Sequence, residues 1–410
     1  MSIRPVVFWL HLLVGVTAGT VIAFMSVTGV LLAFEPQITG WLERDRRIVV
    51  PPPAAARLPL ETLVARAREA RPDVRPSIVT LRSDPTAALV VSFGRDGGAL
   101  FVDPYRGTVL GDFSRVHDVL HEVVEWHRWL GARDVGRPIT GAANLGLLGL
   151  VSLGVFLWWP RGWTAAALRQ ATRFDLSLRG RARNFNWHNV IGIWCAPVLF
   201  VITLTGLVMS YQWASDLLYR LTGSEPPPPA AAEARPAPGG GRSGRAADGR
   251  AREERPARTA EGRAPVGLDA LWARAERQVP GWVLISQRVS ARPDGPVIFV
   301  IQEPTGWHPT PRSQLTLDPI TAEVVRWEPF ADQSLGRRLR SWVRPLHTGE
   351  AGGAAGQAVA LVASAGGAAL VWTGLSLAWR RYRAWRRRVS STSPVTLPAS
   401  PQPSQEASAD

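Results

Sequence analysis

A stretch near the start of the chain, residues 8–34, contains no charged residue and carries one histidine, His11, near its beginning. A run of this length without Asp, Glu, Lys or Arg is long enough to cross a bilayer as a helix. The same pattern returns at 185–211, where His188 takes the place of His11. Because ionisable residues inside a membrane are costly, a histidine kept at one place in two copies indicates a function.

Four segments of the chain are uncharged over a length that spans a bilayer: 5–34, 138–160, 184–215 and 351–379. Each is expected to be a transmembrane helix. The net charge of +14 gathers in short basic segments beside these helices. Because positively charged short loops stay in the cytoplasm, we expect a multi-pass protein of the bacterial inner membrane with both termini inside and both long connections outside.

Composition excludes several other classes of protein. No external region shows a basic stripe with interleaved aromatic residues, so nucleic acid is not an expected partner. The single cysteine, Cys195, lies in the third uncharged segment, so the external parts are expected to hold neither disulfides nor thiolate metal sites. The first uncharged segment is longer than the ~7–15 residues of a signal-peptide core, so it is expected to be a retained anchor.

The two long connections predict two small external domains with one plan, at 58–113 and 266–330. Each begins with a helical pattern, continues with strand-like runs, and ends in an Asp-Pro turn at Asp103 or Asp318. Residues 223–265 are rich in Pro, Gly, Ala and Arg with almost no large apolar residue, which predicts a disordered linker.

The second and fourth uncharged segments also match each other, with His127 in the place of His347. We therefore expect an internal duplication in which each half is helix, external domain, helix.

The predicted fold class is membrane α with an extramembrane α+β part, built as a four-helix transmembrane bundle with two small external domains. The expected division is 1–36 (first transmembrane helix), 58–113 (first external domain), 114–160 (outer helix and second transmembrane helix), 161–183 (cytoplasmic Arg-rich loop), 184–215 (third transmembrane helix), 223–265 (linker), 266–330 (second external domain), 335–380 (outer approach and fourth transmembrane helix) and 381–410 (cytoplasmic tail, mostly disordered).

Four of the seven histidines occupy equivalent places in the two halves. His11 and His188 are expected at one depth near the inner face, and His127 and His347 at another near the outer face. Two facing pairs of imidazoles in a four-helix bundle can hold two b-type haems, each iron ligated from two helices.

Glycines are expected to make room for the porphyrins. Gly29 and Gly206 lie ~27 Å along their helices from the inner histidines, at the level of the outer pair. Gly154 and Gly374 are expected near the inner pair. The alternative is that these small residues only allow close helix packing, while each histidine caps or anchors a helix. Four histidines duplicated in register favour haem ligation.

Two further histidines, His117 and His121, are spaced to share one helix face and could bind a metal ion or substrate at the outer surface. Neither has a counterpart in the second half of the chain. The alternative is that both are ordinary solvated histidines.

Several motifs carry a resemblance to a known family. They are Trp9-x-His11-x3-Gly15 with Thr28-Gly29, His127-Arg128-x-Leu130, Trp187-His188-x3-Gly192 with Thr205-Gly206, and Leu346-His347-Thr348-Gly349-Glu350. The chain resembles the PepSY-associated transmembrane helix family, the PiuB-like iron-regulated membrane proteins, which includes siderophore-iron reductases. The Asp-Pro turns and the helix-strand pattern before them resemble PepSY domains, although Ala322 stands where the first turn has Gly107.

The resemblance implies that the four helices carry haem and pass electrons across the membrane to a periplasmic acceptor such as a ferric siderophore. No flavin or nicotinamide domain is recognised, so the donor is expected to be another protein or a quinol. The residues beside the outer ligands are expected to contact the acceptor: Trp126, Arg128, Trp129, Arg344 and Glu350. The alternative is a non-enzymatic membrane protein that binds or restrains a periplasmic partner such as a peptidase.

Overall fold

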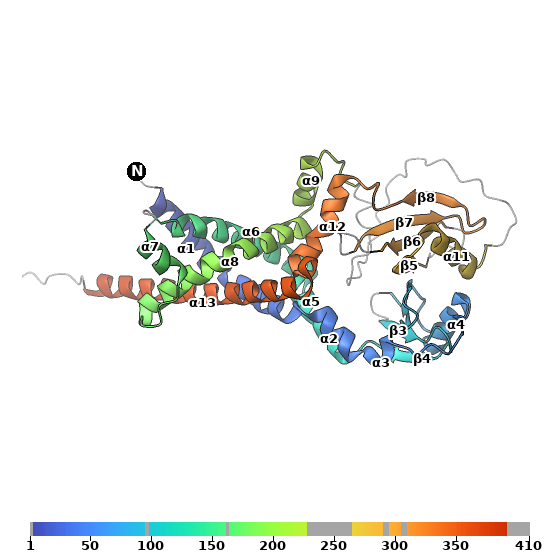
Figure 1. Ribbon diagram of the computed structural model, residues 1–410. Helices are drawn as coiled ribbons and strands as arrows, with labels where there is room; N and C mark the ends of the chain where they lie inside the picture. Colours follow the sequence, from blue (N-terminus) through green and yellow to red (C-terminus); the bar gives the residue numbers. More distant parts are fainter. Residues whose placement is uncertain are drawn as a thin grey trace, which may run out of the picture.

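The computed structural model describes residues 3–94, 98–160, 164–227, 265–289, 295–304 and 310–391. Most of the expected linker, 228–264, and the tail from 392 onward lie outside the described residues. The molecule is elongated, with a bundle of long helices at one end and a β-sheet with two covering helices at the other (Figure 1). The start of the first helix and the end of the last lie at the end of the bundle away from the sheet (Figure 1).

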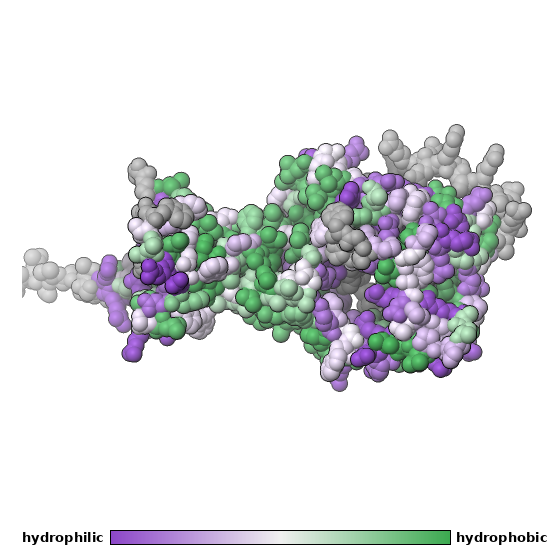
Figure 2. Space-filling model, in the orientation of Figure 1, coloured by the Kyte–Doolittle hydropathy of each residue, from purple (hydrophilic) through white to green (hydrophobic). Residues whose placement is uncertain are grey.

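Four long helices form the bundle, and each is long and apolar enough to cross a membrane. They pack in a ring in which each contacts two neighbours. Figure 2 shows apolar side chains gathered over the bundle, with hydrophilic ones at its far end and over the sheet, as in a multi-pass membrane protein. In ring order the helices are α1 (Arg4–Leu32), α13 (Gly353–Ser391), α8 (Gly180–Ser210) and α6 (Arg133–Trp158).

Shorter helices lie at the two ends of the bundle (Figure 1). On the sheet side are α2 (Glu35–Leu42), α3 (Arg44–Arg47), α5 (Arg115–Trp129), α9 (Gln212–Leu221), α12 (Leu335–Thr348) and the 3-10 turn η1 (Glu350–Gly352), and at the far end is α7 (Ala165–Thr172). Ser114 and Ser334 cap α5 and α12 by accepting hydrogen bonds from the backbone three residues on. The sequence did not predict α2, α3, α7 or α9.

In each half of the chain, a shorter helix, α5 or α12, is followed by a sharp turn that leads into a bundle helix. A Cβ added to Gly136 would lie only 1.6 Å from the Trp129 carbonyl oxygen, so only glycine lets α6 fold back this closely over α5. Gly356 makes the same close approach to the Gly349 oxygen, at 2.3 Å. These paired turns hold the ends of α5 and α12 against the bundle.

The sheet combines both halves of the chain. Its eight strands run in the order β4-β3-β2-β1-β5-β6-β7-β8, with every neighbouring pair antiparallel. The strands are β1 (Ile78–Arg82), β2 (Leu89–Ser92), β3 (Ala99–Val102), β4 (Val109–Asp112), β5 (Leu284–Arg288), β6 (Val297–Gln302), β7 (Arg312–Leu317) and β8 (Val324–Glu328). Each group of four follows a helix, α4 (Leu60–Ala70) or α11 (Leu268–Gln278).

The two expected external domains therefore share one continuous sheet. The seam pairs β1 with β5, and Thr80 Oγ1 lies 2.9 Å from Ser286 Oγ across it. Pairing these strands removes an exposed edge from each half, which explains why the two units join.

Alternate residues of the sheet face opposite sides. Val79, Ile285, Phe299 and Leu315 are fully buried in a hydrophobic core that includes residues of α4 and α11. The residues between them are polar at many positions and remain partly accessible on the other face. The sheet thus presents a polar face away from its covering helices.

The Asp-Pro turns of the two halves have the same hydrogen bonds. Asp103 Oδ1 accepts from the backbone of Tyr105 at 2.8 Å, and Asp318 Oδ1 accepts from that of Ile320 at 2.7 Å. The turn requires a positive φ, which Gly107 supplies at 69° and Ala322 adopts at 56°. The replacement noted in the sequence therefore keeps the turn at the cost of backbone strain.

Candidate functional site

The inner pair of histidines comes together from two helices that face each other across the bundle. His11 lies on α1 and His188 on α8, with their ring centres 6.4 Å apart and their planes at 89°. Metal–imidazole bonds of about 2.0 Å on opposite sides of one ion would place the ring centres roughly 6 Å apart. The separation therefore fits a single metal ion held between the two rings.

The outer pair lies at the C-terminal ends of two shorter helices, with His127 on α5 and His347 on α12. Burial, together with the nearby His347, lowers the pKa of His127 to about 4. Burial also lowers the pKa of His347. Both imidazoles are therefore neutral near pH 7, which is the form that binds a metal ion.

Three of the four histidines meet a threonine of a neighbouring helix through their Nδ1 atoms. The distances to threonine Oγ1 are 2.8 Å for His127 and Thr28, 2.9 Å for His188 and Thr373, and 3.2 Å for His347 and Thr205. Thr28 and Thr205 belong to repeats visible in the sequence, but their contact with histidine was not predicted. Thr373 precedes Gly374 as Thr28 precedes Gly29, so the repeated Thr-Gly pair could have marked these threonines in the sequence.

These contacts favour one position for the ring proton. Each threonine hydroxyl donates to the carbonyl oxygen four residues earlier in its own helix, at 2.9 Å for Thr28, 2.7 Å for Thr205 and 2.8 Å for Thr373. The threonine oxygen is then the acceptor, and histidine Nδ1–H is the donor. His347 Nδ1 also lies 2.9 Å from the Ile202 carbonyl oxygen, which can only accept. In these three rings Nε2 keeps its lone pair for a metal ion.

His11 is the exception. Its Nδ1 is buried and has no hydrogen-bond partner among the residues that the structure describes. It faces the Leu150 carbonyl without the geometry of a hydrogen bond. Leu153 stands one residue before Gly154, as Thr373 stands before Gly374, so His11 lacks the hydroxyl that the other three histidines have.

Glycines lie against three of the imidazoles. A Cβ added to Gly154 would lie 3.4 Å from His11 Cε1, and one added to Gly374 would lie 3.3 Å from His188 Cε1. A Cβ on Gly29 would lie 3.7 Å from His127 Cε1. These glycines let the rings sit against the neighbouring helix backbones.

Gly206 differs from the other three glycines. It packs against the amide of Asn144, whose atoms would be 3.1 Å from an added Cβ. Asn144 is buried and donates to the Thr203 carbonyl oxygen at 2.9 Å. The nearest contacts of Gly206 are thus to α6 and not to an imidazole.

Two tryptophans expected to contact an acceptor have different surroundings. Trp129 is only 7% exposed, and the guanidinium groups of Arg128 and Arg133 each lie over its ring, 4.2 Å from the ring centre. Trp126 is 44% exposed and donates to Glu122 at 2.7 Å. Only Trp126 is accessible to a large partner.

Arg344 and Glu350 belong to a group of charged residues beside the outer histidines. Burial raises the pKa of the Glu35 carboxyl. The nearby Arg344 and His121 lower this pKa, and the nearby Glu350 raises it. These four residues come from α2, α5, α12 and η1, so charges of both signs converge on the outer end of the bundle.

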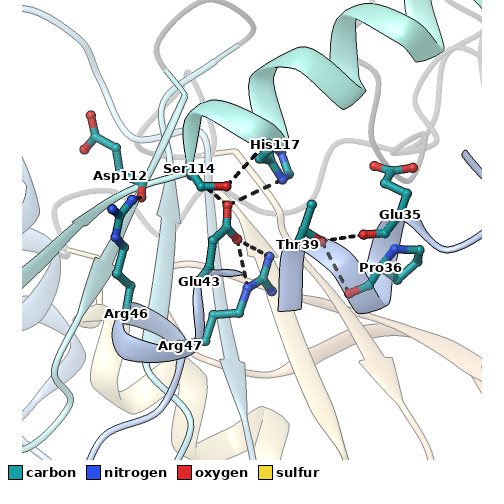
Figure 3. Close-up of polar contacts among 9 residues, drawn as sticks. All are labelled: Glu35, Pro36, Thr39, Glu43, Arg46, Arg47, Asp112, Ser114 and His117. Atoms are coloured by element: carbon teal, nitrogen blue, oxygen red, sulfur yellow. Dashed lines mark hydrogen bonds and ion pairs between the residues drawn. The ribbon is translucent and has the colours of Figure 1, made fainter. Parts of the chain in front are cut away.

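His117 belongs to a buried junction between the sheet and the bundle (Figure 3). The Glu43 side chain is fully buried, accepts from Arg47 Nε at 2.9 Å and Nη2 at 2.6 Å, and accepts from the Ser114 backbone at 2.7 Å. His117 Nδ1 lies 3.8 Å from Glu43 Oε1, and its ring stacks on Phe113 at 3.9 Å. Glu43 had no signal in the sequence that marked it as buried.

The structure gives no support to an additional metal site at His117 and His121. His117 is stacked and faces Glu43, whereas His121 is exposed on α5. Among the described residues, no group of three or more His, Cys, Asp or Glu side chains could hold a metal ion.

The four histidines expected from the sequence to ligate haem have surroundings that suit this role. Three histidines have an oriented Nε2, the fourth has a buried and unpartnered Nδ1, and glycines lie against three of the rings. A comparison with protein families matches residues 8–381 to the model described as PepSY-associated TM region. No curated protein matches the chain.

Proposed function

We propose that this chain, which belongs to the PepSY-associated transmembrane family, carries electrons across the inner membrane through two b-type haems. His11 and His188 would hold the inner haem, and His127 and His347 the outer one. The acceptor is a ferric siderophore on the periplasmic side, and the donor is a quinol or a reductase protein on the inner side.

The orientation of the imidazoles is the observation that most supports this proposal. Three Nδ1–H groups are committed to threonine oxygens, which leaves Nε2 free in helices that otherwise carry few ionisable groups. A structural cap or an interfacial anchor would not require one tautomer repeated in three helices. Repeated orientation through the second nitrogen is typical of metal-ligating histidines.

A bound haem supplies a ferric/ferrous couple that accepts and gives one electron at a time. The chain holds the imidazoles and surrounds them with apolar helices that exclude water. One electron reduces one Fe(III) to Fe(II), so a quinol that loses two electrons and two protons serves two ferric ions. Hard oxygen chelators hold Fe(II) less tightly than Fe(III), and the metal is then released.

Basic residues support the proposed orientation in the membrane. The end of α13 carries a run of arginines, and the loop before α8 carries several more at the same end of the bundle. Short basic segments are retained in the cytoplasm. The sheet would then lie in the periplasm, next to the outer histidine pair.

We also infer that the chain arose by duplication and that each helix with its four strands is a PepSY-like domain. The order α4-β1-β2-β3-β4 in the first half is repeated as α11-β5-β6-β7-β8 in the second. The matching Asp103 and Asp318 turns support the same conclusion.

The haem content of the purified full-length protein tests the proposal. We expect a Soret band, reducible α and β bands, and two haems per chain. His188→Ala and His127→Ala should each remove one haem, and the double variant should remove both. His121→Ala is the control, because this histidine is exposed on α5 and should leave the spectrum unchanged. A colourless protein, or loss of haem only in the control, would contradict the proposal.

The acceptor is tested separately by mixing the reduced protein with a ferric siderophore in the absence of oxygen. We expect the haem bands to return to the oxidised form as Fe(II) is produced. Oxidation by cupric ions or by a periplasmic redox protein, without oxidation by the ferric complex, would assign a different acceptor.

A further inference from the structure

A cavity of about 990 Å³ lies between the sheet and the outer end of the bundle. One wall is formed by β1, β5, β6 and β7 on the polar face of the sheet, and the other includes Tyr219 of α9 and Arg337 of α12. The volume is within the range of about 300–1,000 Å³ that small-molecule sites occupy. The cavity is therefore large enough for one chelate of moderate size.

The sheet side of the cavity is rich in hydrogen-bonding groups. Thr80, Ser286, Gln302 and Gln314 lie in the cavity wall, each alternating with a residue buried in the core below. Hydroxyl and amide groups of this kind can bond the neutral and charged oxygens of a ligand.

Four arginines line the cavity, and they divide into two kinds. Arg326 and Arg337 both pair with Glu328, at 2.5 and 3.0 Å, so one carboxylate serves two cations. Arg288 and Arg312 form no ion pair with any residue in the described part of the chain. Two guanidinium groups thus remain for a ligand.

These two arginines lie on the two strands that flank β6, near opposite ends of it. Arg288 of β5 pairs with Ile298 at the start of β6, and Arg312 of β7 pairs with Gln302 at its end. Four residues of strand separate the pairings, which corresponds to ~13 Å. A ligand that reaches both guanidiniums must carry anionic groups at two separated points.

Arg312 interacts electrostatically with Arg344 of α12. The Arg312 side chain is open to the cavity, but the surrounding protein lowers its pKa, and the charge of Arg344 lowers it further. Arg344 precedes His347 by one helical turn on α12. An anion placed beside Arg312 would offset the repulsion between the two guanidiniums.

Acidic residues also line the cavity, since Glu225 and Asp332 lie in its wall together with Glu328. The cavity is therefore not uniformly positive, and its preference for anions depends on Arg288 and Arg312, which have no ion pair among the described residues. We propose that this cavity binds a polyanionic metal chelate, of the carboxylate or catecholate kind, through Arg288 and Arg312. Binding of the chelate does not depend on the proposed function. Only the ferric ion in the chelate and its reduction rest on that function.

The test uses the full-length protein and gallium(III) citrate, because gallium(III) is not reduced and binding is then independent of haem. Titration calorimetry should detect binding that weakens as the salt concentration rises. Arg312→Gln and Arg288→Gln should each weaken it roughly tenfold, as expected for the loss of a charge-assisted hydrogen bond. Arg277→Gln is the matched control, because Arg277 is exposed on α11, against the opposite face of the sheet.

A cationic gallium(III) hydroxamate complex provides the second comparison and should bind much more weakly than the citrate complex. The inference is overturned if the two complexes bind equally, if neither binds, or if the three arginine variants have the same affinity as the unchanged protein. If the protein binds gallium(III) citrate but contains no haem, the proposed anion site is supported and the proposed electron transfer is contradicted.

Discussion

His188 and Thr373 are joined by a hydrogen bond of 2.9 Å from Nδ1 to Oγ1, and His11, on the other side of the same pair, has no such partner among the described residues. The difference follows from one position of the repeat, where α13 has Thr373 and α6 has Leu153. The two imidazoles of the inner pair are therefore held unequally, and the bundle is less symmetric than its sequence repeat.

Removing the threonine hydroxyl should weaken the inner haem site. We expect Thr373→Val to lower its haem affinity at least about tenfold, because the imidazole loses the bond that fixes its tautomer and orientation. Haem release to apomyoglobin, followed by absorbance, measures the effect. Thr17→Val is the control, since among the described residues Thr17 bonds only to carbonyls of its own helix. Equal release from both variants would show that the hydroxyl does not support the ligand.

Adding the missing hydroxyl should change the inner reduction potential. Leu153→Thr places an acceptor beside His11 Nδ1, which would make this imidazole a stronger donor to the iron and stabilise the ferric state. We expect the midpoint potential of the inner haem to fall and that of the outer haem to stay constant in a spectroelectrochemical titration. A rise in the inner potential, or a shift of both haems together, would disagree with this account.

A larger side chain beside His11 should displace its ring. Gly154→Leu would put side-chain atoms into space that the imidazole occupies, since an added Cβ already lies 3.4 Å from Cε1. We expect a stoichiometry of one haem per chain. Gly149→Leu is the matched control on the same helix, because nothing lies within 4 Å of its added Cβ, and it should keep two haems. Two haems in both variants would argue against His11 as a ligand.

Glu43 should make the junction between sheet and bundle sensitive to acid. Burial raises its pKa, but the backbone N–H of Ser114 and the Arg47 guanidinium outweigh burial, so the pKa is lowered overall. A carboxylate with a lowered folded-state pKa stabilises the protein above its unfolded pKa, and this contribution is lost as the pH falls through the folded value.

We therefore expect Glu43→Gln to lower the free energy of unfolding by about 2 kcal/mol at neutral pH, as for the loss of other hydrogen bonds to a charged group. This difference should shrink as the pH falls below the ordinary glutamate pKa. Thermal unfolding followed by tryptophan fluorescence at several pH values measures this. Glu69→Gln, at an exposed pair with Arg66, should have little effect at any pH. A Glu43→Gln deficit that grows in acid would contradict the lowered pKa.

The repeats visible in the chain predicted more of the site than of the sheet. His11 and His188 were paired from their equivalent places, and the structure puts their rings 6.4 Å apart. The joining of the two strand groups into one sheet was not predicted, because no local pattern in β1 or β5 distinguishes a free edge from one paired with the other half. The haem ligation and the acceptor remain predictions.

The sequence by itself determined the four membrane-length helices and the equivalent histidines, because hydrophobicity and repeated motifs can be recognised in the order of residues along the chain. Only the tertiary structure decided which hydroxyl meets which imidazole. Thr28 and His127 are 99 residues apart, and His188 and Thr373 are 185 apart. Such contacts depend on how helices pack and rotate against each other, which is why the missing bond at His11 became visible only in the folded bundle.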